Sequence, residues 1–154
     1  LGIANVRGKF EDFEGTLEIG EGDTSARAYG SVQGVSVNTG DAGRDEHLRS
    51  ADFFGVEANP ELRFESTSIE HVDDETFEIV GDLSINGVTK PVKLTAEVQG
   101  EETDPWGNER VALEARGQLN RRDWNMTFNQ ALGSGNMLVS DKIKLSLDIS
   151  AIKQ

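Results

Sequence analysis

Apolar and polar residues alternate most regularly in two neighbouring segments near the middle of the chain. Residues 77–85 carry an apolar residue or glycine at every odd position, and residues 88–98 carry apolar residues at most even positions. Since successive side chains of a strand point to opposite faces, each segment predicts a strand with one apolar and one polar face. The Asn86-Gly87 pair between them tolerates the positive φ angles of a type I′ turn, so the two strands are predicted to form a hairpin.

Similar alternation predicts further strands along nearly the whole chain. They cover residues 1–9, with an end at Gly8, and residues 13–19, 26–37, 62–69, 111–119 and 143–151. Within residues 26–37 the apolar positions change phase at Gly34, which indicates a β-bulge that bends a long strand. The one helical pattern covers residues 41–54, and Asp41 or Asp45 is its expected N-cap.

These elements define the predicted fold class. About eight antiparallel strands with a short helical insert near residues 41–54 predict an all-β protein, either a sandwich or an up-and-down barrel. We favour the barrel because closure pairs the edges that long strands would otherwise expose. The 154 residues suit a single domain over residues 1–154.

Several small residues share the apolar phase of the predicted strands. One interpretation is that they leave a lane for a ligand, because an eight-stranded barrel can hold one small molecule. The other is that the glycines mark bends and the alanines fit a taper. We favour the lane. The residues are Gly30, Gly81, Ala96, Ala115 and Gly117.

Composition excludes several kinds of partner and chemistry. The 15 basic and 28 acidic residues give a net charge of −13, which repels nucleic acid and anionic membrane surfaces. The chain has no cysteine, so disulfides and thiolate chemistry are excluded. His47 and His71 lie in different predicted elements, and the helical neighbours of His47 point in other directions, so no metal site is predicted. No ionisable residue occupies the inward phase of the clearest strands, so we expect no enzymatic activity and no cofactor.

Two segments outside the clearest strands carry side chains suited to a flexible apolar ligand. Leu48, Phe53 and Phe54 would close one end of the barrel, and Trp124 and Met126 alternate with polar residues between positions 123 and 128. Aromatic and methionine side chains form adaptable apolar walls. Ordinary core packing under a lid explains the same residues equally well.

Five longer segments carry a family resemblance that extends over essentially the whole chain. They are Val6–Phe10, Gly43–Phe54, Gly81–Val92, Leu119–Trp124 and Leu138–Ile143. In this register the chain resembles the YceI-like, polyisoprenoid-binding family. The resemblance implies a lipocalin-like antiparallel barrel whose long apolar tunnel holds an isoprenoid chain, such as a polyprenol or the tail of a quinone. It also implies binding or transport without catalysis.

The chain departs from the family pattern in two places. Family members usually have a further strand ahead of the position of Leu1, and that strand is expected to be missing from residues 1–154. Asp123-Trp124-Asn125 stands where Asp-Phe-Gly is usual, and the tryptophan is expected to narrow the tunnel mouth. Some members carry a signal peptide; none is visible here, so the cytoplasm is favoured over the periplasm or envelope.

The resemblance and the apolar pattern together give the candidate site. The expected wall of the tunnel consists of Phe10, Phe13, Leu48, Phe53, Phe54, Phe64, Leu113, Ala115, Trp124, Met126 and Phe128. The candidates to face a polar head group, with solvated surface charge as an equal alternative, are Arg44, Arg49, Arg121 and Arg122. The expected partner is a hydrophobic lipid, and both transient membrane contact and a homodimer are compatible with it. The alternatives are an enzyme acting on a hydrophobic substrate in the tunnel, or a stress-related structural protein with a filled barrel.

Overall fold

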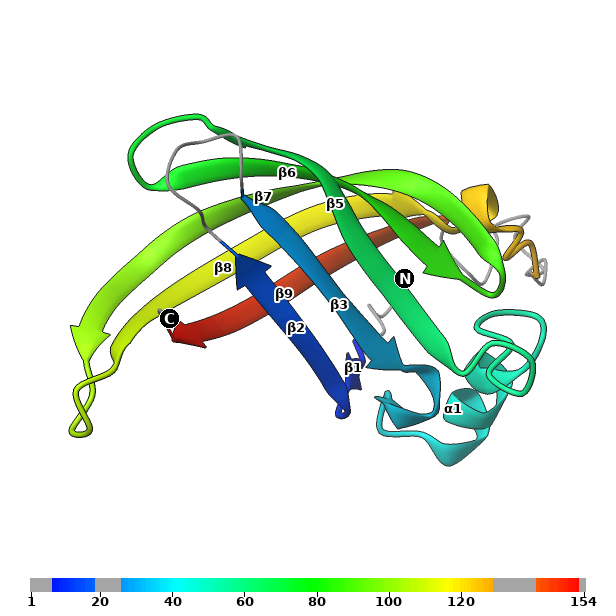
Figure 1. Cartoon of the computed structure of the whole chain (residues 1–154). Coiled ribbons are helices and arrows are strands. Elements are labelled where there is room, and N and C mark those ends of the chain that lie inside the picture. The colour runs from blue at the N-terminus through cyan, green and yellow to red at the C-terminus, as the bar shows by residue number, and fades with distance from the viewer. Residues whose placement is uncertain (1–6, 19–25, 129–140, 153–154) are drawn as a thin grey trace, which may run out of the picture.

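A computed structural model describes residues 7–18, 26–128 and 141–152 (Figure 1). Seven strands form one antiparallel sheet in which almost every strand pairs with its neighbour along the chain. In spatial order they are β2 (Phe13–Glu18), β3 (Arg27–Gln33), β5 (Glu61–His71), β6 (Thr76–Ile85), β7 (Val88–Thr103), β8 (Glu109–Asn120) and β9 (Lys142–Ile152). The short strands β1 (Lys9–Phe10) and β4 (Val37–Asn38) pair with each other in a separate two-stranded sheet.

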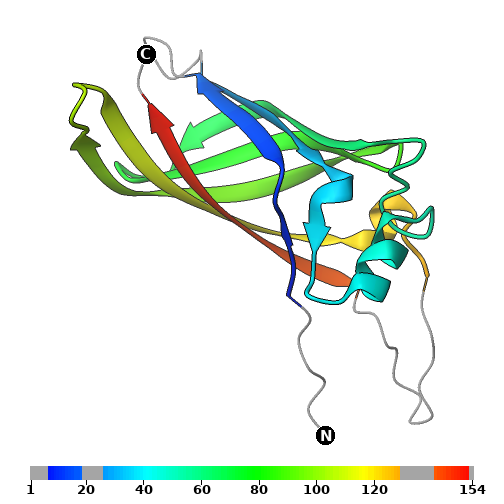
Figure 2. The ribbon, with the colours of Figure 1, turned by 90° about the horizontal axis from the view of Figure 1, so that it is seen from below.

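The large sheet curls strongly into a half-barrel (Figures 1 and 2). Its edges are β2 and β9, and no pairing joins these two strands within the described ranges. The up-and-down antiparallel order and the short helix confirm the predicted fold class. Along β6, β7 and β8 the buried residues alternate with more exposed ones, so the apolar positions line the concave face, as the alternation predicts.

The predicted central hairpin is confirmed. Strands β6 and β7 pair from Thr76 opposite Glu97 to Ile85 opposite Val88, so that only two residues form the turn. Asn86 and Gly87 have φ angles of 50° and 77°. Both angles lie in the left-handed region that a type I′ turn requires.

The break at Gly34 is not the predicted β-bulge. The chain leaves β3 there and forms a 3-10 turn, η2 (Gly34–Ser36), before β4. A Cβ atom on Gly34 would lie 2.5 Å from Cγ1 of Val56, so only glycine allows this close approach. The register shifts instead in β5, between Ser66 and Ser68, and in β7, between Val98 and Gly100. At the start of the described chain, Lys9 begins a strand, whereas the sequence predicts a strand end at Gly8.

The predicted helix is shorter than its pattern. Helix α1 (Ala42–Arg49) begins after Asp41, whose carboxylate accepts the backbone N–H of Arg44 at 3.0 Å as an N-cap. It ends before residues 50–58, which form turns. A second 3-10 turn, η3 (Arg121–Trp124), follows β8. None of the helices in these ranges is long and apolar enough to cross a membrane.

Candidate ligand-binding site

The end of the half-barrel next to α1 is filled by a tightly packed apolar cluster, here called the α1-end cluster. Its buried members are Phe53, Leu62, Ile85, Val92, Leu119, Trp124 and Met126, and Phe10, Val32, Leu48, Phe54, Phe64, Leu83, Val88, Ile143 and Leu145 pack against them. The cluster therefore unites seven of the predicted wall residues: Phe10, Leu48, Phe53, Phe54, Phe64, Trp124 and Met126. They contact one another, so at this end they serve as core.

Aromatic rings hold the loops of this end together. The rings of Phe10 and Phe54 lie 5.4 Å apart. The imidazole of His47 lies 5.1 Å from the ring of Phe53 and 4.5 Å from that of Phe128, edge to face in both cases. The Nε2 atom of His47 is also 2.9 Å from the carboxylate of Asp52. Phe128, a predicted wall residue, thus covers the outside of the α1-end cluster with 36% of its surface exposed.

The structure shows how the fold accommodates Trp124 and Asn125 where Asp-Phe-Gly is usual. Trp124 is 1% exposed and donates its indole N–H to the carbonyl of Leu83 at 2.8 Å, so it belongs to the core. Asn125 adopts φ 60° and ψ 21°, the left-handed conformation that glycine adopts easily and asparagine tolerates.

The middle of the concave face is lined by small and medium side chains. Ala96 and Ala115 lie opposite each other on β7 and β8 and are 3% and 2% exposed. They form a second buried cluster with Ile79 and Leu94. The predicted wall residue Leu113 lies two residues along β8 from Ala115 and is also buried.

The lane of small residues is not open along its length. A Cβ atom on Gly81 would lie 2.4 Å from the end of the Phe64 ring, and one on Gly117 would lie 2.6 Å from Cδ2 of Leu94. Large neighbours on the adjacent strands therefore occupy the space above both glycines. The prediction of an open lane is wrong at these positions, where glycine makes room for core packing.

Large apolar side chains remain exposed on the concave face toward the open side of the sheet. Leu147 and Ile149 on β9 lie opposite the buried Ala115 and Leu113, so their side chains share the concave face, yet they are 39% and 37% exposed. On the other edge, Phe13 lies opposite Val32 and is 64% exposed. Phe13 is a predicted wall residue, whereas Leu147 and Ile149 are missing from the predicted site. The regular alternation of the last strand is the signal that places them on this face.

Two of the four candidate head-group arginines anchor the loop around α1. Arg44 donates from Nε to the hydroxyl of Thr39 and from a terminal nitrogen to the carbonyl of the same residue, both at 2.8 Å. Arg49 donates to the carbonyls of Val35 and Val37. The buried carboxylate of Asp45 accepts the N–H and hydroxyl of Thr39; these hydrogen bonds, with the two arginines, lower its pKa against the effect of burial.

The other two arginines anchor the loop after β8. Arg121 is 1% exposed and donates to the carbonyls of Met126 and Phe128, with the Asp141 carboxylate 3.3 Å away. Burial lowers the pKa of its guanidinium, and Asp141 acts in the opposite direction. Arg122 is half exposed and pairs with Asp141 at 3.0 Å. The structure thus gives every candidate head-group arginine a partner within the protein.

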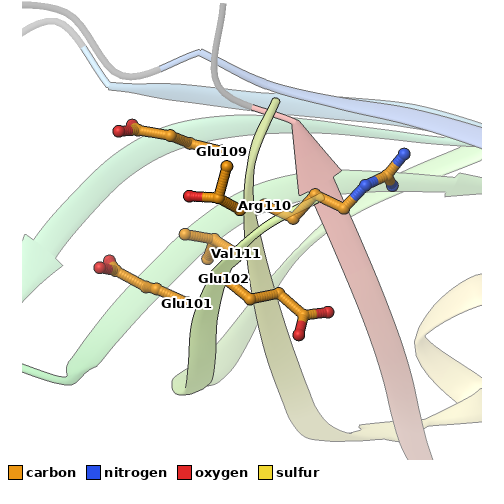
Figure 3. A pocket seen from close by; sticks show the side chains of 6 residues that line it. Glu101, Glu102, Glu109, Arg110 and Val111 are labelled. Atoms are coloured by element: carbon orange, nitrogen blue, oxygen red, sulfur yellow. The ribbon is translucent and has the colours of Figure 1, made fainter. Parts of the chain in front are cut away.

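The opposite end of the half-barrel is acidic. A shallow hollow of about 160 Å³ lies at the end of β7 and β8, and its lining residues are Glu101, Glu102, Thr103, Glu109, Arg110 and Val111. Figure 3 shows Glu101 and Glu109 pointing to one side of the hairpin, and Glu102 and Arg110 to the other. The register agrees, because Glu102 lies opposite Arg110. No group of three histidine, aspartate or glutamate residues in the described segments could hold a metal ion.

The comparisons with known proteins agree with this geometry. The YceI-like domain matches residues 1–151. Protein YceI of Salmonella arizonae is 39% identical over all of this chain and 78% of its own length. The chain belongs to the YceI-like family. The crystal structure of the Campylobacter jejuni YceI protein is 28% identical, with a TM-score of 0.87 over 100% of this chain and 88% of that chain.

A more distant structure shares the YceI-like fold. Burkholderia cenocepacia BcnA is 16% identical, with a TM-score of 0.78 over 94% of this chain and 86% of that chain, a likeness of fold alone. The YceI-like family is known for binding polyisoprenoid-like hydrophobic ligands. Membership indicates a binding protein with a hydrophobic small-molecule ligand, and no enzymatic activity is indicated.

Proposed function

We propose that this YceI-like protein binds a long-chain isoprenoid with an uncharged head group, a polyprenol or an isoprenoid quinone, along the concave face of its half-barrel. The observation that carries the proposal is the exposure of Phe13, Leu147 and Ile149 on the face that also carries the buried core. Exposed large apolar side chains that continue a core surface are typical of a ligand-binding groove.

The two ends of the half-barrel favour one orientation of the ligand. The α1-end cluster is packed with side chains, and the arginines around it are bonded to loop carbonyls, a threonine hydroxyl and Asp141. We therefore place the apolar tail against the exposed Leu147 and Ile149 on the concave face and the head group toward the acidic end. A diphosphate head group would lie beside Glu101 and Glu109 there and be repelled, whereas an alcohol or a quinone would not.

Burial of the isoprenoid chain supplies the affinity. At about 0.8 kcal/mol for each buried CH₂ group, a fully covered five-carbon unit contributes on the order of 4 kcal/mol. Four or more such units, which contribute about 16 kcal/mol or more, outweigh the roughly 4–15 kcal/mol lost in translational and rotational freedom on binding, so no hydrogen bond to the head group is required. Leu147 and Ile149 gain from the same contact because the ligand covers their exposed surface.

Mass spectrometry of lipids extracted from the purified protein, followed by titration of delipidated protein with a polyprenol and an isoprenoid quinone, tests the proposal. We expect a polyprenyl species near one per protein and saturable binding of at least one of the two lipids. A protein that carries no lipid and binds neither would overturn the proposal and leave the structural alternative, a barrel filled by its own side chains.

Two variants on the same strand locate the site. Ile149 and Ile152 are 37% and 41% exposed, and their odd and even positions place them on opposite faces of β9. We expect Ile149→Asn to weaken isoprenoid binding about tenfold, because it removes apolar surface from the groove and adds an amide that must lose water. Ile152→Asn should leave binding unchanged. Equal effects of the two substitutions would contradict a site on the concave face.

A further inference from the structure

An exposed tryptophan stands at the tip of the longest hairpin, far from the α1-end cluster. Trp106 lies in the turn between β7 and β8 and is 82% exposed. Both ribbon views show this hairpin projecting beyond the other strands at the acidic end (Figures 1 and 2). Neither core cluster includes Trp106.

A single carboxylate accepts several hydrogen bonds within the turn that presents Trp106. Asp104 accepts the backbone N–H groups of Trp106 and Asn108, both at 2.9 Å, and the Nε–H of Arg110 at 2.9 Å. Its side chain is only 7% exposed, and Gly107 adopts a φ angle of 85° to complete the turn. Because the Asp104 charge is paired and covered, the outermost residues, Pro105 to Gly107, form an uncharged apolar tip.

We propose that the Pro105-Trp106-Gly107 tip is a shallow anchor for an electrically neutral lipid surface. An indole combines a large apolar body with a polar N–H, so tryptophan is enriched at membrane–water interfaces. Because hydrogen bonds to Asp104 already fix the turn, the tip loses little conformational freedom when it inserts. The inference concerns the tip of the β7–β8 hairpin and does not depend on whether, or which, isoprenoid binds the concave face.

Charge selects the kind of lipid surface. Glu101, Glu102 and Glu109 are exposed just behind the tip, and the whole chain carries a net charge of −13. An anionic surface would repel this hairpin, and the repulsion would weaken as salt screens it. A zwitterionic surface carries no such penalty. The geometry therefore favours phosphatidylcholine-like surfaces over anionic ones, the reverse of the preference of basic peripheral proteins.

Tryptophan fluorescence can follow the insertion directly. The chain has two tryptophans, and the other, Trp124, is 1% exposed in the core. We expect large phosphatidylcholine vesicles to shift the emission of Trp106 to shorter wavelength and brominated lipid to quench it. Vesicles with added phosphatidylglycerol should bind more weakly, and salt should recover part of that binding.

Matched variants distinguish insertion of the tip from non-specific adsorption of the protein to vesicles. Trp106→Ser should reduce vesicle partitioning by about fivefold or more, because it removes most of the inserted apolar surface. Val35→Ser removes an apolar side chain that is 59% exposed near α1, at the other end of the molecule, and should have no effect.

Several results would overturn the anchor. They are an unshifted emission with every vesicle, equal partitioning of the Trp106→Ser and wild-type proteins, and tighter binding to anionic vesicles. A wild-type dimer that Trp106→Ser converts to monomer would instead assign the tip to a contact between two copies. Failure of the protein to bind isoprenoid in solution would leave the vesicle result standing, so the two proposals fail separately.

Discussion

Trp124, a buried member of the α1-end cluster, donates its indole N–H to the backbone carbonyl of Leu83 in a partly buried hydrogen bond 2.8 Å long. The bond links the turn after β8 to β6, two strands away in the sheet. The hydrogen bond gives the indole nitrogen of Trp124 an acceptor. A phenylalanine at this position has no such polar atom and would need no acceptor. The indole therefore both fills the core and fixes the turn to the sheet.

Substitution of Trp124 by phenylalanine should destabilise the fold. The change removes the indole donor from the Leu83 carbonyl and opens a void in the α1-end cluster, so we expect a loss of about 2 kcal/mol in the free energy of unfolding. Urea denaturation followed by circular dichroism measures it. Trp106→Phe is the control, because an 82% exposed side chain should change stability by no more than about 0.5 kcal/mol. Equal stability of the two variants would contradict the structural role of Trp124.

Substitution of Gly81 by alanine tests the close packing of the concave face. The new methyl group would lie 2.4 Å from the Phe64 ring and 2.6 Å from the Glu65 carbonyl, so the strands must shift. We expect a loss of about 1–3 kcal/mol in the free energy of unfolding, measured by urea denaturation.

Two further variants control the Gly81 experiment. Gly100→Ala should be neutral or slightly stabilising, because nothing lies within 4 Å of its new methyl group. Adding Phe64→Leu to Gly81→Ala should recover part of the loss, since it removes the ring but leaves the Glu65 carbonyl. If Gly81→Ala were as stable as Gly100→Ala, the result would contradict the close packing of the Phe64 ring over Gly81.

The strands could be predicted from the sequence because their signal is local. An alternation of period two is visible within a few residues, and Asn86-Gly87 specifies its turn without help from the rest of the chain. Gly34 shows the limit of this reasoning. A phase change with a glycine fits both a bulge and a turn, and the choice depends on Val56, which lies 22 positions later and packs where a Cβ atom would be.

The candidate site was less predictable, because it depends on contacts between distant segments. The sequence identifies apolar residues near α1 and η3, but only the fold shows that Phe53 and Trp124 pack in one cluster and therefore act as core. Leu147 and Ile149 have the same pattern as buried strand residues. Their exposure follows from the position of β9 at an open edge of the sheet, which no local pattern encodes.

Replacement of Arg121 by methionine tests whether this arginine stabilises the loop after β8. The change keeps a long apolar side chain but removes the arginine donor from the buried carbonyl of Met126 and the partly buried carbonyl of Phe128. We expect a loss of about 3 kcal/mol in the free energy of unfolding, measured by chemical denaturation.

Arg122→Met serves as the control for Arg121→Met. The Arg122 side chain is 47% exposed and pairs with the partly exposed Asp141, so its loss should lower stability by no more than about 1 kcal/mol. A larger effect at Arg122 than at Arg121 would show that the ion pair with Asp141, and not the bonds to the carbonyls, stabilises the loop.

Acid should loosen the β7–β8 tip through Asp104. Burial raises the pKa of this carboxyl, but the hydrogen bonds from Asn108, Arg110 and Trp106 outweigh burial and lower the pKa from 3.8 to about 2. Because the pKa is lower in the folded than in the unfolded state, the ionised group contributes its full stabilisation above pH 3.8. That contribution is lost as the pH falls toward 2.

Hydrogen exchange of the Trp106 and Asn108 amides, which donate to Asp104, measures this loss. We expect their protection to fall between about pH 4 and pH 2, relative to amides in the centre of β7, which do not depend on this carboxylate. In Asp104→Asn the two amides should already exchange faster at neutral pH, with little further change on acidification. Protection that fell together with that of β7 would mean that the whole sheet, and not the tip alone, responds to acid.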